Sequence, residues 1–175
     1  MTGANRIWIA GEHSEGLPDS VLYPTVTRAK ELITAGPVLT DICSLRRVID
    51  LPEDLSTLDK NDFKAVKIFL KRAGEMGAKD SYVAQHRCAW WSVRLRAPAP
   101  ILATYMARQA PSFVLNKGAA RHLNIAHGLY PREDMDSALL SHLVNYLRKS
   151  SSLEGGRVYA GGLTKFEPRE MERIP

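Results

Sequence analysis

The residues best suited to binding a ligand lie in one segment that contains no acidic side chain. Residues 81–132 form a run of 52 without aspartate or glutamate, although the chain has 19 acidic residues elsewhere. Seven of the 24 Lys and Arg residues lie in this acid-free segment, and they account for the formal net charge of +5. Tryptophan and tyrosine side chains lie between these cations. Such a composition favours a surface that faces a polyanion, and nucleic acid is the first candidate.

The spacing of two pairs of residues in the acid-free segment, Arg94 with Arg96 and Trp90 with Trp91, predicts which way their side chains point. Residues 89–95 are expected to form a strand, which would place Arg94 and Arg96 on the same face. Arginine is the side chain best suited to bidentate contact with guanine edges or phosphate. Trp90 and Trp91 would point to opposite faces of that strand. Either both rings pack in the core, or one packs against a sugar or an unstacked base.

The sequence predicts neither a catalytic residue nor a metal site. His122 and His127 are five residues apart, so on a strand they would point to opposite faces, and the segment has no acid to complete a metal site. Metal-dependent cleavage needs clustered carboxylates, which are also absent there. No serine or cysteine lies in a nucleophile elbow, and Cys43 and Cys88 are expected to be reduced thiols.

Length and composition indicate one domain of ordinary size with a genuine core. The chain has 175 residues, of which 45% are apolar and 25% charged, as in globular proteins that are soluble. Neither a membrane span nor a secretory signal is recognisable. Helices are expected at 25–35, 61–76 and from Asp134 or Asp136 to Arg148. Strands are expected at 7–10, 46–51, 89–95, 101–106, 112–115, 123–130 and 157–159. This order predicts an α+β fold, in which a mixed sheet of short strands packs with two main helices.

Three ordered motifs carry a resemblance to a known family. They begin at Ala89-Trp90-Trp91, at Asn124-Ile125-Ala126-His127-Gly128-Leu129-Tyr130-Pro131 and at Gly161-Gly162-Leu163-Thr164-Lys165-Phe166-Glu167-Pro168. Together they resemble the C-terminal portion of TaqI-like N6-adenine DNA methyltransferases from bacterial restriction-modification systems. The resemblance covers residues 23–175, and residues 1–22 are expected to be an N-terminal strand and loop that end a preceding domain. It implies a cytoplasmic, DNA methylase specificity-domain-like module that reads double-stranded DNA for adenine-N6 methylation.

The chain departs from this family in lacking the chemistry of methyl transfer. The family's catalytic motif ends in Pro-Pro followed by an aromatic residue, and this chain has no Pro-Pro dipeptide. A glycine-rich turn suited to S-adenosylmethionine is also missing. The chain is therefore expected to be the recognition part of such an enzyme, as a fragment or a separate subunit, and inactive by itself. S-adenosylmethionine is expected in a catalytic domain that is fused upstream or encoded separately.

The predicted binding residues divide by their chemistry. Phosphate contacts are expected from Lys117, Arg121, His127 and Lys165. Base-edge contacts are expected from Arg94, Arg96, Asn116 and Asn124, and a sugar or base contact from Trp90 or Trp91. Two alternatives remain open at this point. One is a module that binds RNA or single-stranded nucleic acid, and the other is a protein-docking subunit with a basic face.

Overall fold

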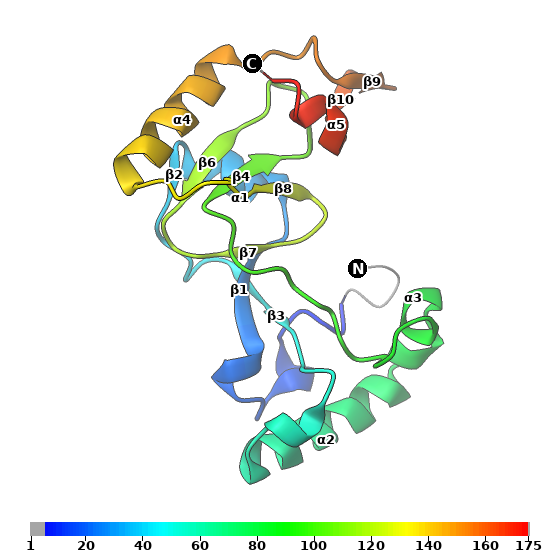
Figure 1. The fold of residues 1–175 in the computed structure, drawn as a ribbon. Helices are drawn as coiled ribbons and strands as arrows, with labels where there is room; N and C mark the ends of the chain where they lie inside the picture. Colours follow the sequence, from blue (N-terminus) through cyan, green and yellow to red (C-terminus); the bar gives the residue numbers. More distant parts are fainter. Residues whose placement is uncertain (1–5, 175) are drawn as a thin grey trace. The chain divides into compact units, whose positions relative to one another are not determined.

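Helices and short strands follow one another irregularly, and the predicted α+β class is confirmed. The computed structural model describes residues 6–174, and its contacts divide the chain into two units (Figure 1). The first unit comprises Met1–Pro24 and Arg46–Leu95, and the second comprises Thr25–Leu45 and Arg96–Pro175. The chain therefore passes between the units three times, whereas the sequence suggested a single boundary after residue 22.

The long helix α2 (Lys60–Glu75) organises the first unit. Asp59 caps it by accepting hydrogen bonds from the backbone N–H groups of Asn61 and Asp62, each at 2.8 Å. Its buried face consists of Val66, Phe69 and Ala73. Gly77 follows at φ 82°, the left-handed conformation that the sequence predicted for the end of this helix. The other elements of the unit are η1 (Glu12–Ser14), η2 (Asp19–Val21), the start of β1 (Leu22–Val26), β3 (Arg46–Ile49), η3 (Leu55–Thr57), η4 (Ala78–Asp80) and α3 (Tyr82–Gln85).

Two strands predicted for the first unit are wrong. Residues 7–10 contribute a single bridge, from Ile9 to Val48. Residues 89–95 form no strand, because the carboxylate of Asp50 satisfies the backbone instead. It accepts the N–H of Arg94 at 2.9 Å and the N–H of Leu95 at 3.0 Å. Arg94 also has φ 58°, which is outside the strand region. The argument that placed Arg94 and Arg96 on one face of a strand therefore fails.

The second unit is built around the four-stranded sheet β2-β6-β4-β8 (Figure 1). The central strand β4 (Ile101–Thr104) runs antiparallel to both neighbours, with Leu102 opposite Val114 on one side and Gly128 on the other. Strand β2 pairs with β6 in parallel. The other strands of this sheet are β2 (Val38–Leu39), β6 (Phe113–Asn116) and β8 (Ala126–Leu129).

Both faces of this sheet are covered, which explains why all four residues of β4 are buried. Leu102 and Val114 belong to one cluster, which also contains Leu32 of α1 (Ala29–Ala35). The second cluster contains the alternate residues of the same strands, such as Ile101, together with Val144 of α4 (Ser137–Ser150). Successive side chains of a strand point to opposite faces, so one short apolar strand supplies two cores.

The remaining elements of the second unit are short. The helix predicted from Thr25 begins later, because residues up to Val26 belong to β1 and Thr27 and Arg28 donate their backbone N–H groups to Glu31. A second sheet has the order β5-β10-β9. These elements are β5 (Met106–Ala107), β7 (Arg121–His122), β9 (Arg157–Tyr159), β10 (Leu163–Lys165) and α5 (Pro168–Met171).

Leu102→Ala should destabilise the second unit by about 2–5 kcal/mol, because it removes a fully buried side chain from β4 and leaves a cavity. Urea unfolding followed by circular dichroism measures the effect. Leu139→Ala in α4 is the matched control, since Leu139 is 49% exposed and the same change there should alter stability by less than about 0.5 kcal/mol. Equal losses in the two variants would contradict the assignment of β4 to the core.

Candidate nucleic-acid interface

The positive charge of the chain is concentrated in the second unit. This unit contains 13 of the 24 Lys and Arg residues but only 9 of the 19 acidic residues, whereas the first unit contains 11 and 10. A polyanion is therefore attracted mainly to the second unit.

Arg96, Arg121 and Tyr130 form one cluster in that unit, which we call the Arg96–Arg121 cluster. The Arg121 guanidinium donates a hydrogen bond to the carbonyl oxygen of Arg96 at 3.3 Å. The Tyr130 hydroxyl donates to the carbonyl oxygen of Ala97 at 2.7 Å. Both bonds tie β7 and the end of β8 to the extended segment at residues 96–100, so two predicted contact residues are brought together with an aromatic ring.

Burial and the positive charges of this cluster both act on the pKa values of His122 and Tyr130. Burial lowers the pKa of His122, and the nearby charges of Arg96 and His127 lower it further. Burial raises the pKa of Tyr130, while Arg96 and Arg121 oppose that shift. The charged side chains that act on these two groups are therefore the cations Arg96 and Arg121 and the imidazole of His127.

The buried side chain of Asn116 links the backbone segments that carry Arg96 and Arg121. Its side-chain amide donates to the carbonyl oxygens of Ala99 and Ala120, each at 2.8 Å, and accepts the N–H of Ala120 at 2.9 Å. Asn116 is only 7% exposed. Its amide is thus hydrogen-bonded to the backbone close in sequence to Arg96 and Arg121 and is turned away from solvent.

Lys117 and Asn124 are the other predicted contact residues that face solvent here. Lys117 lies in the turn between β6 and β7 and is exposed, as is Asn124 just after β7. The turn is tightly packed on its inner side, because a Cβ atom on Gly118 would lie 2.7 Å from the carbonyl oxygen of Thr40. This packing holds Lys117 at the surface.

His127 and Lys165 belong to a different group of contacts. His127 Nε2 donates to the carbonyl oxygen of Phe166 at 2.7 Å, and its ring packs edge-on against Tyr105. Lys165 forms an ion pair with Glu167 at 2.5 Å and lies 5.0 Å from the centre of the Tyr105 ring. The side-chain hydrogen bond to Glu167 is the largest cause of the raised pKa of Lys165. Lys165 therefore stays protonated, and Glu167 and Tyr105 engage its ammonium group within the protein.

Trp90, Trp91 and Arg94 are engaged within the first unit. The two tryptophan rings pack edge-on at 5.8 Å, and Trp90 also lies 6.2 Å from Trp8. Trp91 donates its indole N–H to the carbonyl oxygen of Pro52 at 2.9 Å. Arg94 forms an ion pair with Glu53. The acid-free segment thus meets carboxylates that come from elsewhere in the sequence.

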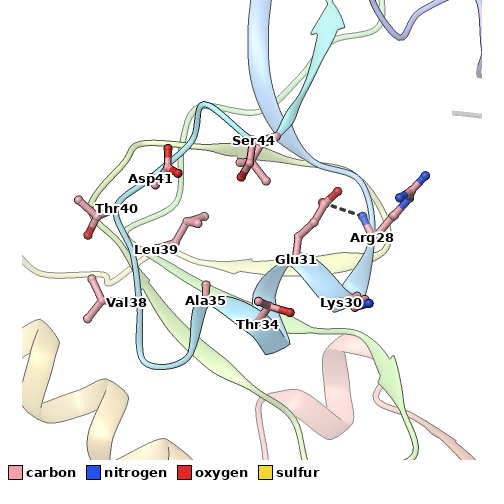
Figure 2. A pocket seen from close by; sticks show the side chains of 11 residues that line it. Arg28, Lys30, Glu31, Thr34, Ala35, Val38, Leu39, Thr40, Asp41 and Ser44 are labelled. Carbon is pink, nitrogen blue, oxygen red and sulfur yellow. Dashed lines mark hydrogen bonds between the residues drawn. The ribbon is translucent and has the colours of Figure 1, made fainter.

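A pocket of about 540 Å³ lies beside α1 in the second unit (Figure 2). None of the predicted binding residues lines it. Figure 2 shows Glu31 turned toward the backbone of Arg28, whose N–H it accepts at 3.0 Å. Asp41 similarly accepts the N–H of Cys43 at 2.8 Å. Both carboxylates therefore serve to cap local backbone, and Arg28 and Lys30 are exposed at the rim.

Within residues 6–174, no three His, Cys, Asp or Glu side chains are grouped so that they could hold a metal ion. The same part of the chain contains no helix that is both long and apolar enough to span a bilayer. Cys43 and Cys88 are free and exposed.

Comparison with known proteins assigns the chain to a class of type II methyltransferase domains. Residues 44–175 match the family described as the C-terminal domain of type II methyltransferase M.Eco57I, and the chain belongs to this family. It is 58% identical over 174 residues to type II methyltransferase M.XamI of Xanthomonas campestris pv. amaranthicola, covering 99% of this chain and 33% of that protein. It is 22% identical over 180 residues to M.AccI of Acinetobacter calcoaceticus, covering 98% of the chain and 33% of that protein. The predicted resemblance to the C-terminal part of a methyltransferase is confirmed, and the chain spans a third of these relatives' length.

Tyr130 and His122 were not among the predicted binding residues, although both belong to or border the Arg96–Arg121 cluster. Tyr130 lies in the Asn124–Pro131 motif and among the aromatic residues of the acid-free segment, and neither signal pairs it with Ala97. The hydrogen bond to Ala97 joins residues that are 33 positions apart, so spacing alone could not reveal it.

Asn116→Ala should destabilise the chain by about 2–4 kcal/mol, because the buried backbone groups of Ala99 and Ala120 lose their hydrogen-bond partner. Asn124→Ala is the matched control and should have little effect, since Asn124 is exposed. Chemical denaturation of both variants provides the comparison. An unchanged stability of Asn116→Ala would mean that this amide does not hold the segments together.

His122 should make stability depend on pH. Its pKa is lowered in the folded state, so the unfolded chain binds the proton more readily. Stability is then highest above about pH 6.5, the ordinary histidine value, and falls as the pH drops below it toward the lowered pKa. His122→Gln should flatten the dependence of unfolding free energy between about pH 5 and 7. The same slope in the variant and the wild type would remove His122 as the cause.

Proposed function

We propose that this domain recognises the double-stranded DNA target of a type II DNA methyltransferase that modifies adenine at N6. The Arg96–Arg121 cluster supplies the principal contact, with Lys117 and Asn124 beside it in sequence on the same unit. Methyl transfer and S-adenosylmethionine binding belong to the part of the relatives that this chain does not cover. A bacterial cytoplasmic location accompanies this role.

The observation that supports this proposal is the Arg96–Arg121 cluster itself. Two arginines and a tyrosine are held together by hydrogen bonds to the backbone, in the unit that carries most of the excess positive charge. Arg96 forms no ion pair with any carboxylate in the described part of the chain, so its guanidinium remains available to a ligand. The backbone of Arg96 is fixed by the bond from Arg121, and its exposed guanidinium is of the type suited to phosphate or to guanine edges.

The membership of a methyltransferase family favours duplex DNA over other polyanions. A single module buries limited surface, so the isolated chain should bind weakly and is best studied at low salt. Titrations with labelled duplex DNA, single-stranded DNA and RNA at the same ionic strength separate the alternatives. Preference for RNA or a single strand would replace the proposal with the corresponding module, and no binding to any of them would favour protein docking.

Arg96→Ala should weaken duplex binding by about 1–3 kcal/mol, because it removes an exposed guanidinium from the cluster. Fluorescence anisotropy with a short labelled duplex measures this loss. Arg169→Ala is the matched control: Arg169 is an exposed arginine of the second unit outside the cluster, and its loss should change affinity only slightly. Equal affinities of Arg96→Ala and the wild type would contradict the proposed contact.

A further inference from the structure

The solvent-exposed face of α2 carries a stripe of lysines that lies outside the acid-free segment. Lys60, Lys64, Lys67 and Lys71 are spaced by four, three and four residues, which places them along one side of the helix. All four are exposed, and the buried residues of the helix lie on its other side. We call these four residues the α2 lysine stripe.

The charge of this stripe is not balanced within the protein. None of the four lysines forms an ion pair with a carboxylate among residues 6–174. Asp62 and Glu75 are the only acidic residues of the helix, and Asp62 already accepts a hydrogen bond from Ser20 at 3.3 Å. Ile68 is 56% exposed and follows Lys64 by four residues, at the edge of the stripe. The stripe is thus a row of ammonium groups without ion pairs among the described residues, in which Lys67 lies 5.2 Å from the centre of the Phe63 ring and Ile68 adds an apolar edge.

This arrangement works against the stability of the helix. Lys60 lies in the first turn, where the partial positive charge of the helix N-terminus disfavours a cation. Lys60 and Lys64, and likewise Lys67 and Lys71, are like charges four residues apart, which repel each other on a helix surface. An ordinary solvated face usually alternates charges of opposite sign. A row of like charges is therefore more easily explained by a polyanionic ligand.

We propose that the α2 lysine stripe is a second DNA-contacting surface, which binds the sugar–phosphate backbone of the duplex without reading its sequence. This inference rests on the proposed function and assigns a separate role to the first unit. Lysine suits it, because a flexible ammonium attracts phosphate as a point charge and does not discriminate among base edges. Ile68 would then lie against the apolar part of a deoxyribose.

The test compares two variants of the full chain that lose the same amount of charge. In the stripe variant, Lys60, Lys64, Lys67 and Lys71 are all replaced by Gln, which is also a good helix former. In the control variant, Lys30, Lys149, Arg169 and Arg173 are replaced by Gln; these are exposed cations of the second unit outside the Arg96–Arg121 cluster. Duplex affinity is measured by anisotropy over a range of salt concentrations, and Tm is measured alongside.

The stripe variant should bind every duplex at least about tenfold more weakly at low salt. Its dependence of log affinity on log salt should become shallower by about 3.6, since each of the four phosphate contacts contributes about 0.9. Its Tm should be unchanged or higher, because repulsion along the helix is relieved. Replacing the same four lysines by Arg should retain binding, and the control variant should lose far less.

Each other outcome decides against the stripe. If the stripe variant binds like the wild type while Arg96→Ala loses affinity, the stripe is a solvated face or a site for an acidic protein, and the proposed function still stands. Equal losses in the stripe and control variants would show that net charge, and not this helix face, determines affinity. If the wild-type chain binds no duplex at low salt, the proposed function fails and the stripe proposal fails with it.

Discussion

The buried amide of Asn116 is the interaction on which the candidate interface depends. It bonds to Ala99, in the connector that carries Arg96, and to Ala120, which directly precedes the strand that carries Arg121. A buried amide with unmatched donors is costly, so this arrangement is stable only when Ala99 and Ala120 remain in place. The short strand β4, which is buried on both faces, begins directly after this connector. Core packing and the presentation of the two arginines are therefore parts of one local structure.

The sequence predicted those elements whose pattern is set by local periodicity. The helix at 61–76 was predicted to within one residue of α2, since its apolar spacing, its start and Gly77 agree. The second helix and its cap at Asp136 were also among the predicted possibilities. Residues 89–95 looked like a strand, but the backbone N–H groups of Arg94 and Leu95 are bound by Asp50, which is more than 40 residues away. Composition cannot reveal a partner at such a separation.

The candidate site was also predicted only in part, because contacts between residues distant in sequence could not be foreseen. A segment without acids predicted a polyanion-binding surface, and Arg96, Arg121 and Tyr130 of the proposed contact lie within that segment. It did not indicate which cations remain available, because Glu53 pairs with Arg94 from outside the segment and Glu167 pairs with Lys165. Asn116 has the residue type that pairs with adenine edges, yet its environment turns it inward. The lysines of α2 were not predicted to bind a polyanion, because acidic residues lie near them in the sequence. In the part of the chain that the structure describes, these acidic residues form no ion pair with the four lysines.

The most direct test is a selection from a library of random duplexes with the intact chain at low salt, followed by sequencing of the bound fraction. A domain that recognises a methylation target should enrich one short sequence, and Arg96→Ala should lose that enrichment while keeping weak general binding. If the wild-type chain enriches no sequence, or if the Arg96→Ala variant enriches the same sequence equally well, the Arg96–Arg121 cluster does not read DNA.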